Sequence, residues 1–208
     1  MSVKEQIAEK VNIVAEIHFS IYPQLKSTLR KTYIADAGMK MTSGASTYFE
    51  WWTNRFGDKF FEMATFVRLG SVAEAAFRDY YMDRKRIDNL VDLKADPAYT
   101  PGVFQRVISG SSTLQALYNV HLGIDIKSFS EFSSVREFFV HRHLYAHNSG
   151  LLDEKYLADL DAVGGQPKPS AETLANLGHP AQDAYWFEPL SNLNKYIEDF
   201  RRLFRQLP

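Results

Sequence analysis

The sequence of 208 residues contains no cysteine. This absence excludes disulfide bonds, iron–sulfur clusters held by cysteine and zinc sites built from thiolates. It suits a reducing cytoplasm, which is where we expect the protein to act. A metal site would have to use histidine and carboxylate side chains, and the whole chain has six histidines.

Long apolar runs are also missing. No stretch approaches the roughly 18 consecutive apolar residues that a membrane-spanning helix needs. The first twenty residues, MSVKEQIAEKVNIVAEIHFS, are amphipathic and include acidic residues. A secretory signal peptide would begin with basic residues and continue with apolar ones. We therefore expect no membrane partner.

The chain has no excess of charge of either sign. It carries 24 lysines and arginines against 25 acidic residues, a net charge of −1. No global attraction to nucleic acid follows, so any contact with RNA must depend on local basic groups. Two such groups occur on expected helices, Arg84 to Arg86 and Arg201, Arg202 and Arg205. Runs of this kind are more commonly solvated helix faces.

The composition is otherwise that of a globular protein, with 45% hydrophobic and 24% charged residues. Aromatic residues are plentiful, at 14% of the chain, which favours a well-packed core and a subunit interface. The aromatic stretch STYFEWW (46–52) is expected to pack in the core or an interface, with stacking on nucleic-acid bases as the alternative.

Apolar residues recur at spacings of three and four over most of the chain, which predicts helices. From Val3 to Tyr33 they predict an amphipathic helix that is bent or broken at Pro23. A loop is expected at 36–47, a connector at 94–102 and mostly loop from 164 to 188. The remaining helices are expected at 58–93, at 103–122 with Gly123 as its stop, at 131–147, from a cap at Asp153, and at 189–206.

These patterns predict an all-α helical bundle. We expect residues 58–208 to form the main helical domain and residues 1–57 to add a helical segment and loop that pack on it. Gly70, inside the expected helix at 58–93, either interrupts that helix or lets a second helix approach closely.

Three of the six histidines lie in VHRHLYAHNSG, residues 140–150. In a helix at 131–147, Phe138, Phe139 and Leu144 would face the core. His143 and His147 are four residues apart and would be neighbours on one face. Arg142 and His147 are five residues apart, about 140° around the axis. The two side chains can flank one groove, or meet across a two-fold axis between two copies of the helix.

Three interpretations of this cluster remain open. The first is a helix C-terminus, where cationic side chains are favoured by the helix dipole. The second is a metal site on His143 and His147, although a site needs three or four ligands and the spacing commits no third one. His121, His141 and His179 are the possible additional donors. The third is metal-free acid–base chemistry on a phosphodiester, because histidine titrates near neutral pH and arginine matches phosphate oxygens.

The string from Arg142 to His147 is an arginine, four residues and a histidine, and it runs into HNSGLLDEKYL. It resembles the HEPN superfamily of all-helical ribonucleases and RNA-binding domains, whose signature is arginine, four to six residues and histidine. It is particularly similar to the branch found in prokaryotic conflict and abortive-infection systems. The resemblance covers about 131–157. It extends more weakly to 66–82, where Glu74 matches an inward acid of an earlier core helix.

The resemblance implies an HEPN-like bundle and a metal-independent endoribonuclease without a cofactor. Such enzymes use the 2′-hydroxyl to attack the adjacent phosphate and leave a 2′,3′-cyclic phosphate. His147 would transfer the proton, and Arg142 would bind the scissile phosphate. Asn148 and His143 would support these residues or bind substrate, and Glu74 would hold Arg142. Each of the three also has a structural interpretation, as a helix stop, a packing residue and a solvated acid respectively.

The resemblance also implies partners. RNA would be the substrate, and a homodimer would bring two histidines to one centre. A toxin or antiphage defence role would involve a neutralising antitoxin or another defence-system partner. In HEPN toxins paired with small nucleotidyltransferase antitoxins, a tyrosine follows the motif histidine after one residue, but this chain has Ser149 there. That particular partnership is therefore not expected. The alternative function is a catalytically silent HEPN-like module that binds RNA or another protein.

Overall fold

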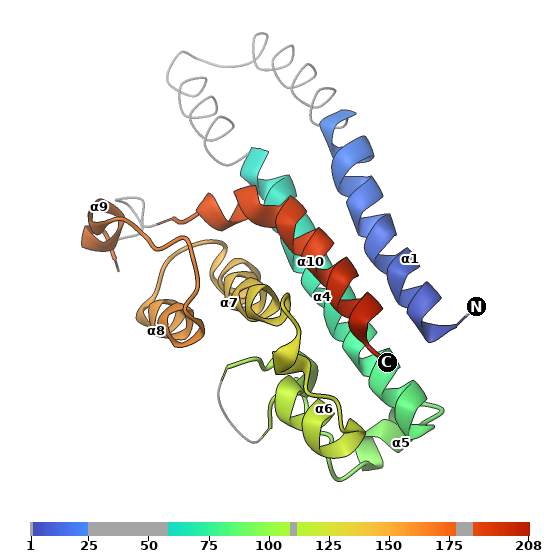
Figure 1. The fold of residues 1–208 in the computed structure, drawn as a ribbon. Helices are drawn as coiled ribbons and strands as arrows, with labels where there is room; N and C mark the ends of the chain where they lie inside the picture. Colours follow the sequence, from blue (N-terminus) through green and yellow to red (C-terminus); the bar gives the residue numbers. More distant parts are fainter. Residues whose placement is uncertain (1, 25–57, 109–111, 178–184) are drawn as a thin grey trace.

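The computed structural model describes residues 2–24, 58–108, 112–177 and 185–208 (Figure 1). Within these ranges the chain forms helices and one isolated β-bridge, between Leu151 and Tyr185. The all-α prediction is therefore confirmed. None of the helices in the described ranges combines the length and the apolar character needed to cross a bilayer. The expectations for 25–57, including the loop at 36–47 and the aromatic stretch at 46–52, lie outside the described residues.

Three long helices, α1 (Val3–Glu16), α4 (Asp58–Lys85) and α10 (Leu193–Gln206), run side by side (Figure 1). A capping box at Ser2 and Glu5 starts α1, satisfying two backbone N–H groups that lack partners within the helix. The buried face of α1 joins the same hydrophobic cluster as α4, α7 and α10. The N-terminal helix thus packs on the core formed by the later helices.

The first helix changes geometry before its proline. A π-helical turn occupies Ile17–Ile21, and the helix then continues through Pro23 to Gln24. Proline has no N–H and its ring clashes with the carbonyl four residues earlier, here that of Phe19. Widening the preceding turn relieves that clash. The predicted irregularity therefore lies one turn before Pro23.

Two predicted helix boundaries are wrong. The helix expected at 58–93 ends at Lys85, and a separate short helix, α5 (Leu90–Ala95), follows. Asn89 starts α5 by accepting hydrogen bonds from two backbone N–H groups, and this local cap outweighs the continuing apolar spacing. The helix expected at 103–122 has only a 3₁₀ turn at Val103–Gln105 before α6 (Leu114–Leu122) begins. A cap at the residue before Leu114 explains that start.

The other helix ends follow their local signals. Gly123 ends α6 in the left-handed conformation, at φ 69°, as expected. The candidate helix, α7, spans Phe132–Asn148, and α8 spans Glu154–Val163 after its cap, Asp153. A short helix, α9 (Ala171–Ala175), lies within the region expected to be mostly loop. A 3₁₀ turn at Glu188–Asn192 leads into α10.

The core fixes the position of α7. Phe138 stacks on Phe66 of α4, with ring centroids 4.5 Å apart, and meets Phe200 of α10 edge to face at 5.0 Å. Such pairs contribute about 0.5–1.5 kcal/mol each beyond their burial. Phe139 and Leu144 are buried as well, so the predicted core face of this helix is confirmed. The opposite face of α7 is left for polar side chains.

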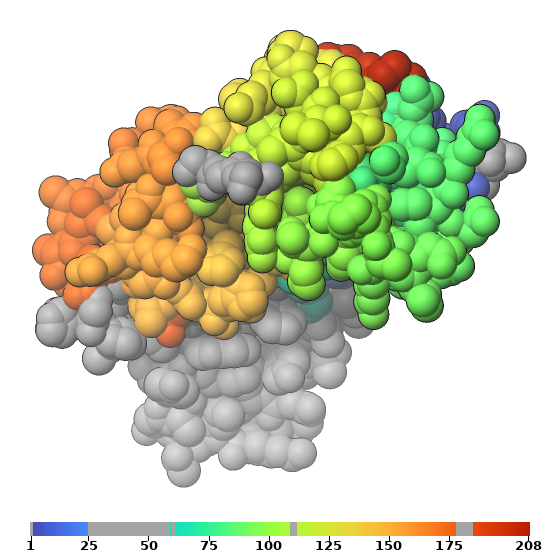
Figure 2. Space-filling view, turned by 90° about the horizontal axis from the view of Figure 1, so that it is seen from below, coloured from blue at the N-terminus to red at the C-terminus, as the bar shows by residue number. Residues whose placement is uncertain are grey.

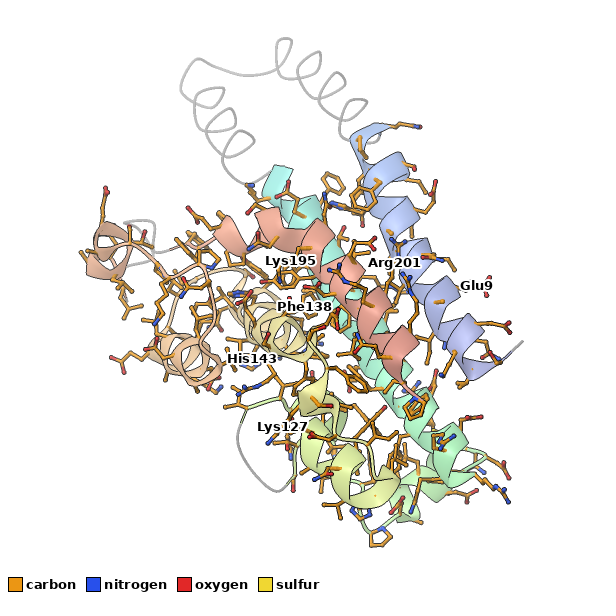
Figure 3. The ribbon with its side chains drawn as sticks, viewed as in Figure 1. Glu9, Lys127, Phe138, His143, Lys195 and Arg201 are labelled. Carbon is orange, nitrogen blue, oxygen red and sulfur yellow. The ribbon has the colours of Figure 1, made fainter. Side chains whose placement is uncertain are left out.

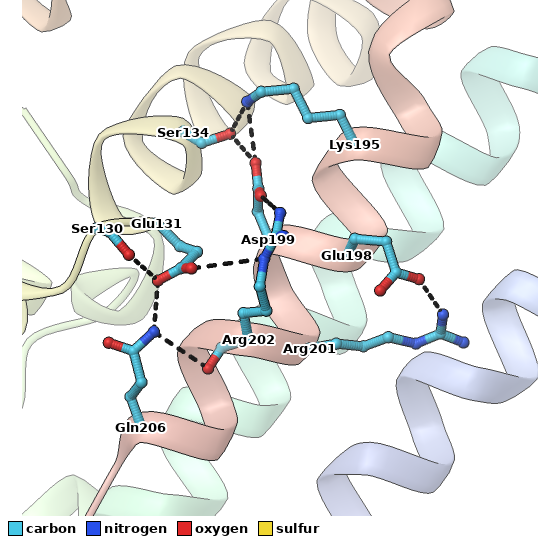
Figure 4. A network of polar contacts seen from close by, with 9 residues as sticks. All are labelled: Ser130, Glu131, Ser134, Lys195, Glu198, Asp199, Arg201, Arg202 and Gln206. Atoms are coloured by element: carbon cyan, nitrogen blue, oxygen red, sulfur yellow. Dashed lines mark hydrogen bonds and ion pairs between the residues drawn. The ribbon is translucent and has the colours of Figure 1, made fainter.

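A polar network ties the start of α7 to α10 (Figure 4). The buried Asp199 accepts hydrogen bonds from Ser134 at 2.5 Å, Lys195 at 2.9 Å and Arg202 at 2.6 Å. Burial opposes ionisation of this carboxyl, but these three donors lower the pKa of Asp199 below its ordinary value. Arg202 also pairs with Glu131 at 3.5 Å. The network and the aromatic contacts hold the first half of the buried face of α7 in place.

Candidate functional site

A cavity of about 820 Å³ lies between the second half of α7, the start of α8 and residues 101–108 and 112–113. Figure 2 looks onto this face, where the surface is hollowed between the orange residues of α8 and the green residues that precede α6. Apolar side chains, including Val107, Phe139 and Val140, line part of it. The charged, histidine and amide side chains that line it are Gln105, Arg106, Arg142, His143, His147, Lys155 and Asp159.

Arg142 is held on one side of this cavity by two neighbours. Its Nη1 donates a hydrogen bond to Oε1 of Gln105 at 2.8 Å. Its side chain passes over Gly70 of α4, where a Cβ atom would lie 2.7 Å from Cγ of Arg142. Gly70 therefore does not interrupt α4. It makes the space in which α4 and the arginine side chain approach each other, one of the two predicted outcomes.

The Nε of Arg142 is buried and has no hydrogen-bond partner among the described residues. A buried donor without an acceptor is unfavourable by about 1–3 kcal/mol, and more when the group is charged. The side chain of Arg142 also lines the cavity, and a guanidinium is suited to bind an anionic group there.

His143 and His147 lie together at the mouth of the cavity. Their ring centroids are 4.5 Å apart, and both side chains are exposed. In Figure 3, His143 is on the side of α7 turned away from α10, whereas Phe138 is on the inner side. The prediction that the two histidines share one helix face is confirmed. His143 and His147 line the same cavity as Arg142, so the fold brings these three predicted residues together.

The surroundings of His143 favour the neutral ring. Partial burial, followed by the charges of Lys155 and His147 and more weakly that of Arg142, lowers the pKa of His143, while Asp159 acts in the opposite direction. A histidine with a lowered pKa is predominantly uncharged at neutral pH, and a neutral imidazole can accept a proton.

Other residues of the site could not be assigned from sequence. Lys155 and Asp159 of α8 form an ion pair at 2.5 Å and line the cavity, as do Gln105 and Arg106 from the segment before α6. The only sequence signal for the pair on α8 is its spacing of four, which is typical of any exposed helix face. Its position beside His143 depends on the packing of α8 against α7.

Two supporting residues have different roles from those expected. The acceptor that holds Arg142 is Gln105, in place of Glu74, which does not line the cavity. Asn148 donates a hydrogen bond to Asp153, whose other carboxylate oxygen caps α8. It therefore links α7 to α8. The left-handed residue that stops α7 is Ser149, at φ 52°.

The third histidine of the cluster is a core residue. His141 is 0% exposed, and its ring nitrogens lie 2.8 Å from the Tyr156 hydroxyl and 3.3 Å from the Gln166 carbonyl. Burial lowers its pKa to about 4, so the ring is neutral. The nitrogen facing the carbonyl donates, and the other accepts from Tyr156. This arrangement occupies both nitrogens and removes His141 from the candidate metal ligands.

The remaining candidate metal ligands do not complete a set. His121 does not line the cavity, and His179 lies outside the described residues. Across the part of the chain that the structure describes, no group of three or more histidine, cysteine, aspartate or glutamate side chains is arranged to hold a metal ion. The pair of histidines on α7 therefore has no third ligand among those residues.

In comparisons with known proteins, no family model, no curated protein and no solved structure matches the chain. The cavity and the sequence motif are therefore the features that indicate a function.

Proposed function

We propose that the chain is a metal-independent endoribonuclease of the HEPN type. The observation that carries this proposal is that Arg142 and His147, the two residues of the sequence motif, line one open cavity. Arg142 is a cation held in place by Gln105, and His147 is an exposed histidine. Cleavage of a phosphodiester bond requires both stabilisation of the developing charge and proton transfer.

The other residues of the cavity support an anionic substrate. Arg106 and Lys155 add positive charge to that of Arg142, while Asp159, paired with Lys155, is the acid among the lining residues. This local excess of positive charge contrasts with the net charge of −1 for the chain. RNA binding that depends on a few such contacts is expected to weaken steeply as salt increases.

The proposed reaction uses the substrate's own nucleophile. The 2′-hydroxyl of RNA loses its proton to a histidine, and its oxygen attacks the adjacent phosphorus. The bond from phosphorus to the 5′-oxygen breaks, and that oxygen takes up a proton. Arg142 stabilises the negative charge that develops on the phosphate oxygens. The products end in a 2′,3′-cyclic phosphate and a 5′-hydroxyl, and DNA is not a substrate because it lacks the 2′-hydroxyl.

The first test uses the wild-type protein with a mixed single-stranded RNA and a DNA of the same sequence. We expect RNA fragments with 2′,3′-cyclic phosphate ends, no DNA cleavage, and the same rate with and without EDTA. End-group analysis and gel electrophoresis measure these outcomes. A rate that EDTA abolishes would contradict a metal-independent reaction. Binding of RNA without cleavage across many RNAs would favour the RNA-binding alternative.

Replacing Gly70 by alanine is expected to slow cleavage while α4 remains folded. The new Cβ would lie 2.7 Å from Cγ of Arg142, so the arginine must leave its position over α4. The loss is expected to approach that of removing a charge-stabilising donor, about 10²–10³-fold. Cleavage rates and thermal unfolding are measured together. Ser71→Ala, at the next and exposed position of α4, is the matched control. An unchanged rate in Gly70→Ala would show that this placement of Arg142 is not required.

A further inference from the structure

We infer that His143 and His147 act as a pair, one as general base and the other as general acid, so that a single protomer holds both proton-transfer groups. This inference rests on the proposed function. It adds His143 as a second catalytic residue, and it removes the need for a second subunit to supply a second histidine.

The geometry of α7 carries the inference. The two rings are 4.5 Å apart, which allows them to face neighbouring oxygens of one phosphodiester. Both are exposed and line the cavity that also contains the guanidinium of Arg142. The buried face of the helix, fixed by Phe138 and the network at Asp199, keeps this exposed face directed into the cavity. Packing therefore preorganises the pair.

The charges around the pair assign the two roles. Burial, Lys155 of α8, and His147 and Arg142 of its own helix lower the pKa of His143, and Asp159 of α8 opposes them. The neutral His143 is therefore the base. His147, the other histidine of the pair, is then left to act as the acid.

The step balances in protons and bonds. Nitrogen of His143 takes the proton from the 2′-hydroxyl as the bond between the 2′-oxygen and phosphorus forms. The bond between phosphorus and the 5′-oxygen breaks, and its electron pair stays on that oxygen. His147 donates a proton to the same oxygen. Exchange with water then returns His143 to its neutral form and His147 to its protonated form.

The variants His143→Ala and His147→Ala test whether one protomer uses two catalytic histidines or each subunit contributes only one. Each is expected to lose about 10²–10⁴-fold in cleavage rate. The double variant should lose little more than either, because residues that act as a unit are not additive. His121→Ala is the matched control, since His121 is an exposed histidine outside the cavity, and its rate should equal that of the wild type. Circular dichroism confirms that each variant folds.

A substrate with sulfur in place of the bridging 5′-oxygen assigns the acid. A thiolate leaves without protonation because it is a much weaker base than an alkoxide. This substrate should restore cleavage by His147→Ala to near the wild-type rate and leave His143→Ala slow. In the wild type with ordinary RNA, the rate should rise with pH as the base deprotonates and fall as the acid does, and His143→Ala should lose the rising limb. If His143 had only a structural role, the rising limb of the pH profile would remain in His143→Ala.

A mixture of the two variants tests whether the pair lies in one chain. Mixed at equal concentrations, His143→Ala and His147→Ala should show no more activity than the sum of the two alone. Recovered activity would overturn the inference in favour of a site shared between subunits. If His143→Ala cleaves within a few-fold of wild type while His147→Ala does not, the inference is wrong and the proposed function stands. If the wild type cleaves no RNA, both are wrong.

Discussion

Replacing His147 by alanine is expected to slow RNA cleavage by about 10²–10⁴-fold, the usual contribution of a general acid or base. Replacing Arg142 by alanine is expected to slow it by about 10²–10³-fold, the usual contribution of a donor that stabilises developing charge. The first change removes an exposed histidine that we propose transfers the proton. The second removes a cation that Gln105 and Gly70 hold in place at the cavity.

Single-turnover rates on one RNA of defined sequence measure both losses. The matched controls are His121→Ala, as above, and Arg205→Ala, which removes an exposed arginine of α10 that does not line the cavity. Both controls should cleave as the wild type does. RNA binding, measured by filter retention at fixed salt, should weaken more in Arg142→Ala than in His147→Ala, because arginine contacts the phosphate in the ground state as well. Equal cleavage by the variants and the wild type would disprove the assigned roles.

The stability of the protein is expected to fall as the pH drops from about 6.5 to about 4, and His141 should be a main cause. Its pKa is lowered from 6.5 in the unfolded chain to about 4 in the fold by burial. Between these values the unfolded state binds a proton that the folded state does not, so the free energy of unfolding decreases as the pH falls. The shift corresponds to about 3 kcal/mol, fully lost below pH 4.

Urea denaturation at pH 7.5 and pH 4.5 measures this effect in the wild type and in His141→Gln. The variant is expected to be less stable at pH 7.5, because glutamine fits the contacts to Tyr156 and Gln166 less well. Its further loss between the two pH values should be smaller than that of the wild type, since glutamine does not titrate. His121→Gln, at an exposed histidine, should keep the wild-type difference. If His141→Gln lost as much stability between pH 7.5 and pH 4.5 as the wild type, the acid sensitivity would come from other groups.

The sequence alone determined those features of the protein that depend on residues within about one helical turn of each other. The caps at Asp153 and Gly123, the apolar face of α7 and the shared face of His143 and His147 follow from side chains that satisfy or pack on nearby backbone. The same locality explains the wrong boundaries. Apolar spacing continued past Lys85 and began before Leu114, but the caps at Asn89 and Thr113 marked the actual starts of α5 and α6.

Only the tertiary structure decided which polar side chains share the site. Gln105 holds Arg142 from 37 residues away in the chain, a role for which the family resemblance had offered Glu74 as one of two interpretations of that residue. His141 and His143 are two residues apart, yet one is enclosed by Tyr156 and Gln166 and the other lies beside Lys155 at an open cavity. Helical periodicity separates the two rings, but it does not say which of them another helix will cover. That depends on how α8 packs against α7, because burial and hydrogen-bond partners are properties of elements brought together from distant parts of the chain.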